Sequence, residues 1–120
     1  MPSGILFVHT NFPGQFRDLA QTLVAAGVPC AAIGSQTAPG LPGVIIGRYV
    51  LPRGSTPGIF PFATRAEADL IRGRAALDMA RQLKAGGFDP EVIIGHTGWG
   101  ETVFLKDTFP HARQICFSEF

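Results

Sequence analysis

Charge is scarce in this chain of 120 residues, because Asp, Glu, Lys and Arg make up only 16% of it, against an average share of about 25%. The net charge is +1 and no block of lysines and arginines occurs, so nothing indicates a nucleic-acid-binding surface. The amino-terminal segment MPSGILFVHTNFPG lacks the basic start and the apolar length of a signal peptide or membrane span. We therefore expect a cytoplasmic protein, with peripheral contact at the inner face of a membrane left open.

Cysteine and histidine are also few. Cys30 and Cys116 each lie inside an apolar run, which favours small buried side chains over a redox or metal role. His9, His96 and His111 lack the spacing of metal ligands, so we expect no metal and no resident cofactor.

Several motifs that would define an enzyme class are missing. No G-x-G-x-x-G and no Walker lysine follow the first apolar run, and GSQ after the second has no acidic residue to hold a ribose, which disfavours a dinucleotide enzyme. No G-x-S-x-G occurs, which disfavours a small hydrolase. The acidic cluster of a receiver domain is absent as well.

Apolar residues are plentiful, at 46% of the chain, and their pattern alternates between two periods. Continuous apolar runs, which are typical of strands buried on both faces, occupy residues 5–9, 29–34, 44–50, 91–95 and 113–120. Helical periodicity or helix-boundary signals occupy residues 15–26, 64–85 and 100–109. The pair Thr64 and Glu67 has the spacing of a capping box, which predicts the start of the second helix.

This alternation predicts one α/β domain with a parallel sheet. Right-handed crossovers favour a Rossmann-like, doubly wound sheet of order 3-2-1-4-5, in three αβα layers. The order places Cys30 and Cys116 too far apart for a disulfide.

In such sheets ligands bind beyond the carboxyl ends of the strands, where the strand order reverses. Strands 1 and 4 flank that point, and the loops that follow them open with His9 and His96. We therefore expect both imidazoles in one crevice. A histidine can exchange a proton near neutral pH, although a histidine at a strand end is often only a structural hydrogen-bonding group.

The segment HTGWGE, residues 96–101, has further candidate binding residues. Gly98 and Gly100 would let a substrate approach the backbone, and Trp99 offers a flat face for a sugar ring, unless it is a core residue. Glu101 is expected at the start of a helix, where it either caps that helix or contributes to the site. After strand 1, Pro13, Gly14 and Gln15 lead into a helix whose free N–H groups would suit a phosphate.

Two segments, ILFVHTNFPGQFRDLAQTLVAAG and FDPEVIIGHTGWGETVFLKDTFPHARQICFSEF, resemble the amino-terminal part of family 4 glycosyltransferases of the GT-B fold, the second being close to a bacterial subgroup. The resemblance covers residues 4–34 and 88–120. It implies the acceptor-binding, amino-terminal domain of a retaining enzyme that transfers a sugar from a nucleotide-sugar to a glycan, lipid-linked or small acceptor without a metal. We expect residues 1–120 to be a fragment that lacks the donor-binding domain and is inactive alone.

By this resemblance Gly14 and its neighbours would approach the donor phosphates, and His96 would lie near the reacting sugar as the catalytic residue. Trp99 and Glu101 belong to the subgroup's pattern. The alternative function is a non-catalytic, flavodoxin-like module that binds a phosphate-containing ligand or a protein partner. Ile59, Phe60, Phe62, Phe117 and Phe120 are candidates for exposed apolar surface, so we also expect self-association.

Overall fold

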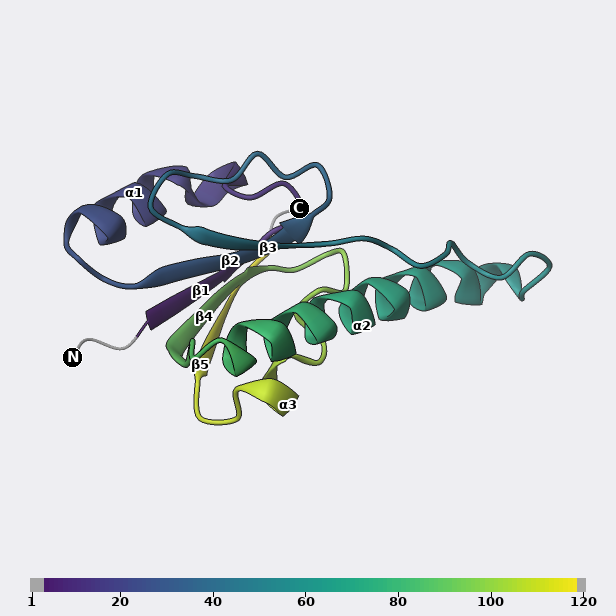
Figure 1. Ribbon diagram of the computed structural model, residues 1–120. Coiled ribbons are helices and arrows are strands. Elements are labelled where there is room, and N and C mark those ends of the chain that lie inside the picture. The colour runs from purple at the N-terminus through teal and green to yellow at the C-terminus, as the bar shows by residue number, and fades with distance from the viewer. Residues whose placement is uncertain (1–3, 119–120) are drawn as a thin grey trace.

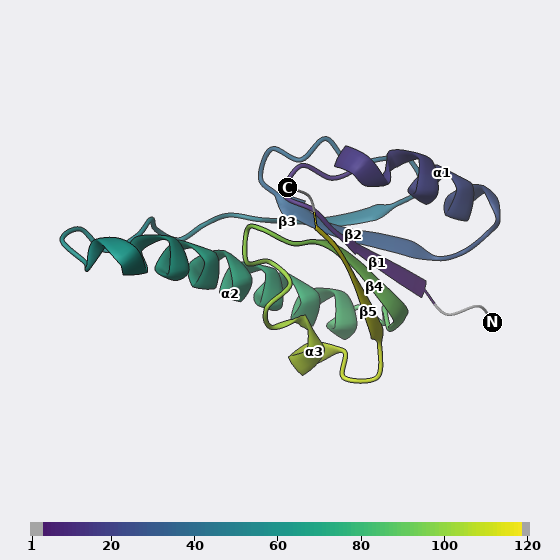
Figure 2. The ribbon, with the colours of Figure 1, turned by 180° about the vertical axis from the view of Figure 1, so that it is seen from behind.

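The computed structural model describes residues 4–118 and contains one five-stranded sheet. All neighbouring strands are parallel, and their order is β3-β2-β1-β4-β5, as the sequence predicts. The strands are β1 Gly4–Val8, β2 Cys30–Ser35, β3 Ile45–Tyr49, β4 Pro90–His96 and β5 Arg113–Phe117. Helix α1 lies on one face of the sheet and helices α2 and α3 lie on the other, which gives three layers (Figures 1 and 2). The predicted Rossmann-like α/β fold is therefore confirmed.

The α1 layer is built on the apolar stripe seen in the sequence. A 3-10 turn, Gly14–Phe16, leads into α1, Arg17–Ala25. Phe16 and Ala20 are buried against Phe7 of β1, and this cluster forms the core on that face. Leu19, which shares the stripe, is 44% exposed, so the buried face of α1 is narrower than the pattern indicates.

The opposite layer holds α2, Thr64–Ala85, and the short α3, Leu105–Thr108. Ala76 and Ala80 of α2 pack against Val8 and other buried residues of the central strands. Alanines allow the helix to lie close to the sheet, and burying their methyl groups contributes to the hydrophobic stabilisation of this layer.

The helix predicted over residues 100–109 is wrong at its beginning. Residues 101–104 form turns, and only Leu105–Thr108 are α-helical. Gly100 has a φ of +91°, and the Glu101 side chain is completely buried. The chain therefore turns inward at this point, and tertiary burial overrides the local helical pattern.

The capping box predicted at Thr64 and Glu67 does not form either. The residue before the first turn of α2 is Ala63, and no side chain caps it. The Glu67 carboxylate instead accepts hydrogen bonds from the backbone N–H and the hydroxyl of Thr56, and it pairs with Arg53 at 3.2 Å. These contacts, led by the Thr56 N–H, hold the pKa of Glu67 below its usual value and fasten the preceding loop to α2.

An arm projects from the body of the molecule. It consists of the first half of α2 and the connection 51–63, and Figure 1 shows it extending well beyond the sheet. The principal extents of the protein are 50 × 27 × 22 Å. The aromatic rings of Phe60 and Phe62 contact one another here, and their residues are 60% and 90% exposed.

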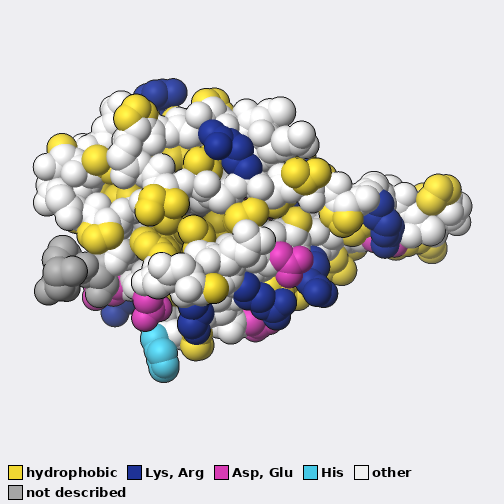
Figure 3. Space-filling view, viewed as in Figure 1, with side chains coloured by type: hydrophobic (Ala, Val, Ile, Leu, Met, Phe, Trp, Pro, Cys, Tyr) yellow, Lys and Arg dark blue, Asp and Glu magenta, His cyan; other side chains and the backbone are white. Residues whose placement is uncertain are grey.

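Five large apolar residues were predicted to be exposed. This prediction is confirmed for Phe60, Phe62 and Phe117, whereas Ile59 is half-buried and Phe120 lies outside the described residues. Figure 3 shows apolar side chains gathered in a band between the α1 layer and the α2 layer. Most charged side chains on this face lie along the α2 layer.

The two cysteines differ in environment. Cys30 is buried, and burial raises the pKa of its thiol. Cys116 is exposed, so the prediction that both are buried is wrong for this residue. The cause is its position in β5, an edge strand with every described residue except Gln114 exposed. Both cysteines are free, in agreement with the expectation that they do not pair.

Candidate functional site

Two histidines meet at the carboxyl edge of the sheet. His9 follows β1 directly and His96 is the last residue of β4, and these strands are parallel neighbours with Val8 opposite Gly95. The ring centroids lie 4.7 Å apart at an interplanar angle of 41°. Both residues are less than a tenth exposed. The prediction that topology brings the two imidazoles together is confirmed.

The His9 ring is held in one orientation by its own loop. Its Nδ1 accepts a hydrogen bond from the Asn11 backbone N–H at 2.9 Å, and its Nε2 lies 2.5 Å from Oε1 of Gln15. Because Nδ1 is the acceptor, the ring hydrogen is on Nε2, which donates to Gln15. The edge of the ring meets Phe16 at 5.7 Å between centroids.

Position 14 requires a glycine for a steric reason. Its φ is +47°, and a Cβ atom at this position would lie 2.4 Å from Nε2 of His9. Any larger residue would therefore displace the imidazole. Of the residues predicted for this loop, Gly14 and Gln15 lie against the His9 ring, whereas the Pro13 side chain is fully buried.

Trp99 is held on the surface of the loop that follows β4. It is 44% exposed, so the alternative interpretation as a core residue is excluded. The guanidinium carbons of Arg65 and Arg72 lie 5.3 and 5.9 Å from its ring centroid, distances typical of cation–π contacts. The ring keeps exposed area on which a sugar or another planar group can stack.

Glu101 is a buried carboxylate rather than a helix cap. It is 0% exposed, and α3 begins only at Leu105, so the predicted position at a helix start is wrong. Its oxygens accept hydrogen bonds from the Thr10 hydroxyl at 2.9 Å and from the Tyr49 hydroxyl at 2.5 Å. Glu101 therefore ties the loop after β4 to the ends of β1 and β3.

Tyr49 and Arg72 extend this network. Nη1 of Arg72 donates to the Tyr49 hydroxyl oxygen at 3.2 Å. Burial, reinforced by the hydrogen bond to Glu101, raises the pKa of Tyr49 to about 12. Neither residue was predicted from the sequence as a site residue. The position of Tyr49 at the carboxyl end of a strand could have indicated a role in the site. Arg72 lies in the middle of a helix, where no sequence pattern indicates such a role.

The loop after β4 also packs tightly on α2. A Cβ atom on Gly100 would lie 2.1 Å from the carbonyl oxygen of Asp69, and one on Gly73 would lie 2.7 Å from that of Gly100. Arg65 donates to the carbonyl oxygen of Gly98 and pairs with Asp69 at 3.0 Å. Gly100, one of the predicted substrate-binding glycines, thus serves first to bring two backbones into contact, whereas a Cβ atom on Gly98 would meet only the His96 ring, at 4.0 Å.

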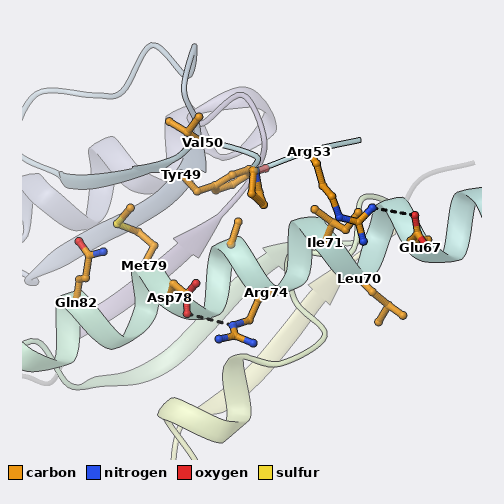
Figure 4. A pocket seen from close by; sticks show the side chains of 12 residues that line it. Tyr49, Val50, Arg53, Glu67, Leu70, Ile71, Arg74, Asp78, Met79 and Gln82 are labelled. Carbon is orange, nitrogen blue, oxygen red and sulfur yellow. Dashed lines mark hydrogen bonds and ion pairs between the residues drawn. The ribbon is translucent and has the colours of Figure 1, made fainter. Parts of the chain in front are cut away.

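A groove of about 510 Å³ lies elsewhere, between α2 and the chain that leaves β3 (Figure 4). Apolar side chains such as Ile71 and Met79 contribute to its lining. Its two arginines are paired, Arg53 with Glu67 and Arg74 with Asp78. None of the residues predicted from the sequence as site residues lines it.

Within residues 4–118, no group of three or more His, Cys, Asp or Glu side chains is arranged to hold a metal ion. In the same part of the chain, no helix has the length and apolar character needed to cross a membrane.

The model of the Glycosyl transferase family 4 group matches residues 26–120. The chain belongs to this family. The matched part of this family 4 domain includes β2 to β5 and the site residues His96, Trp99 and Glu101, whereas His9 and Gly14 precede it. No curated protein and no solved structure gives a significant match to the chain.

Proposed function

We propose that this family 4 domain is the acceptor-side, amino-terminal domain of a retaining glycosyltransferase. The reaction would move a sugar from a nucleotide-sugar to a glycan, a lipid-linked sugar or a small acceptor. The observation that carries the proposal is the pairing of His9 and His96 at the carboxyl edge of the sheet, in a chain that belongs to a glycosyltransferase family.

The two loops have complementary parts in this proposal. The loop with Gly14 and Gln15 fixes the His9 ring and would approach the donor phosphates through its backbone. The loop with His96, Gly98 and Trp99 would receive the sugars: Trp99 as a stacking face and His96 as a hydrogen-bonding group near the bond that breaks. Glu101 is buried and would orient this loop rather than contact substrate.

His96 has the role of a positioned hydrogen-bonding group, not a nucleophile. Such a group accelerates a reaction when its hydrogen bond is stronger in the transition state than in the ground state. Removing one preorganised group of this kind costs roughly 3 kcal/mol, which corresponds to about a 100-fold loss of kcat.

The test replaces His96 by glutamine in the complete gene product. His96→Gln retains a polar side chain in a nearly buried position, so we expect a melting temperature close to wild type and a kcat about 100-fold lower with nucleotide-sugar donors. His111→Gln, at an exposed histidine before β5, is the matched control and should retain full turnover.

Wild-type turnover in His96→Gln would show that His96 is structural. Absence of transfer by the wild-type gene product, over a panel of nucleotide-sugars and acceptors, would contradict the proposed function itself.

A further inference from the structure

Arg72 differs from the other arginines of the arm and α2. Each of the other four pairs with a carboxylate at 3.0–3.5 Å, namely Arg53, Arg65, Arg74 and Arg81. Within residues 4–118, Arg72 forms no ion pair, and its hydrogen bond goes to the neutral hydroxyl of Tyr49. Its positive charge thus has no direct carboxylate counterion, and the guanidinium has further N–H donors for another acceptor.

The position of this guanidinium is fixed before any ligand arrives. The Tyr49 hydroxyl holds Nη1 at 3.2 Å, and the Trp99 ring lies 5.9 Å away. Tyr49 is held in turn by the buried Glu101. A cation that is already oriented loses little side-chain entropy when it binds a ligand, which favours affinity.

Arg72 lines a pocket of about 290 Å³ at the carboxyl edge of the sheet. The turn after β2 contributes Ser35, Gln36 and Thr37, and the end of β3 contributes Tyr49. The apolar residues Val50 and Leu51 complete the lining. The two hydroxyls and the amide of the turn, beside one cation, are the donors that an oxyanion on a hydroxyl-rich molecule needs. The volume approaches the lower limit for small-molecule sites.

The pocket adjoins the loop that carries His9. The Ser35 backbone N–H donates to the Thr10 carbonyl oxygen at 2.9 Å, and the Thr10 hydroxyl donates to Glu101. The pocket and the histidine pair are therefore joined through Thr10, on one edge of the sheet.

We propose that this pocket binds an anionic group, a phosphate or a carboxylate carried by a sugar, with Arg72 as its anchor. In the context of the proposed transferase, on which this part of the inference rests, the acceptor would be an anionic sugar. Glu101 does not compete for the N–H donors of Arg72, because the Tyr49 hydroxyl lies between the two groups and the carboxylate oxygens accept hydrogen bonds from Thr10 and Tyr49.

The test uses binding alone, without a donor or turnover. Trp99 is the single tryptophan of the chain, so its fluorescence reports on the surroundings of Arg72. We expect saturable binding of glucose 6-phosphate or of glucuronate, at least roughly tenfold tighter than binding of glucose, as one charge-assisted contact provides. The two anionic probes separate a phosphate site from a carboxylate site, and amide shifts of Ser35 and Thr37 should locate either.

The variant Arg72→Met should weaken binding of the preferred anionic probe at least roughly tenfold, and Arg72→Lys should restore part of it, because the charge remains but the planar fork is lost. Arg74→Met, on the same helix but in the neighbouring groove, is the control and should bind like wild type. Ligand-detected NMR gives the same constants if Arg72→Met changes the Trp99 emission by itself.

Any one of three results would overturn this inference. The first is equal binding of glucose and the anionic probes, and the second is unchanged binding by Arg72→Met. The third is that neither anion binds below roughly 10 mM, which is a very weak affinity. Anion binding without any glycosyl transfer by the gene product would preserve the pocket and refute the proposed function, so the two failures are distinguishable.

Discussion

At the scale of single residues, the site is organised around a buried carboxylate that makes no contact with solvent. Glu101 accepts hydrogen bonds from Thr10 and Tyr49, which come from two other strand ends. A buried carboxylate is tolerated only when its oxygens are satisfied. Glu101 therefore fixes the relative positions of the chain ends that follow three strands, and the pKa of Tyr49 depends on that arrangement.

Tyr49 should titrate far above a free phenol. It is the single tyrosine of the chain, so the near-ultraviolet absorbance of phenolate follows it alone. Burial and then the contact with Glu101 raise its pKa to about 12, whereas the unfolded chain should titrate near 10. A spectrophotometric pH titration of native and urea-unfolded protein checks the difference.

The same shift makes stability depend on pH. Because the folded-state pKa is raised, the stabilisation is complete below pH about 10 and is lost as the pH rises toward about 12. Tyr49→Phe should lack this component, and Glu101→Gln should lower the Tyr49 pKa by removing the negative charge. A native phenol that titrates near 10 would contradict both the burial of Tyr49 and its hydrogen bond to Glu101.

At the scale of elements, the contact between α2 and the loop after β4 places the site residues. Gly73 in the helix and Gly100 in the loop let the two backbones touch, and Arg65 of α2 binds the Gly98 carbonyl oxygen. The arm and the candidate site are thus one packed unit, because a side chain at either glycine would separate them.

Gly100→Ala should be strongly destabilising. The new Cβ would lie 2.1 Å from the Asp69 carbonyl oxygen, at a φ of +91°, so the loop must shift at a cost of roughly 3 kcal/mol. Gly27→Ala is the control, because its φ of +82° gives a similar backbone strain but nothing lies within 4 Å. It should cost only about 1 kcal/mol.

Urea unfolding followed by Trp99 fluorescence measures both free energies of unfolding. Equal losses in the two variants would mean that backbone conformation alone, not the contact with α2, requires Gly100.

At the scale of the whole molecule, the main feature is the arm, which projects beyond the sheet. It exposes Phe60 and Phe62 at its end and Leu70 along α2. Exposed apolar residues gathered in one region commonly mark a contact surface.

We predict that the protein self-associates through this arm at high concentration. The double substitution Phe60→Ser and Phe62→Ser should reduce self-association in sedimentation velocity, because it removes the most exposed aromatic pair. Val103→Ser, at another exposed apolar residue, is the control and should not change it. A wild-type chain that stays monomeric at submillimolar concentration would contradict the prediction.

The sequence was sufficient for the sheet and for the meeting of the two histidines. Five apolar runs separated by helical or loop segments leave few allowed topologies, since crossovers are right-handed. The strand order then places His9 and His96 at one edge without any knowledge of side-chain packing. The exposure of Phe60 and Phe62 followed from their place in a segment rich in proline and glycine.

Local patterns failed where tertiary contacts competed for the same group. The Glu67 carboxylate has the spacing of a capping box, but it bonds to Thr56 and Arg53, which the loop brings to it. Glu101 was expected at a helix start and is buried instead, because Thr10 and Tyr49, near the ends of strands distant in sequence, supply its hydrogen bonds.

What the sequence by itself determined is therefore the order of the strands and the edge at which function-bearing loops meet, because periodicity and handedness act along the chain. What only the tertiary structure decided is which polar group each side chain bonds to. Arg72 shows the difference: its sequence neighbours carry no sign of a site. Only the folded chain places its guanidinium beside Tyr49 and Trp99, without a carboxylate partner within residues 4–118. Electrostatic pairing depends on distances of a few ångströms between residues far apart in sequence, and those distances exist only after folding.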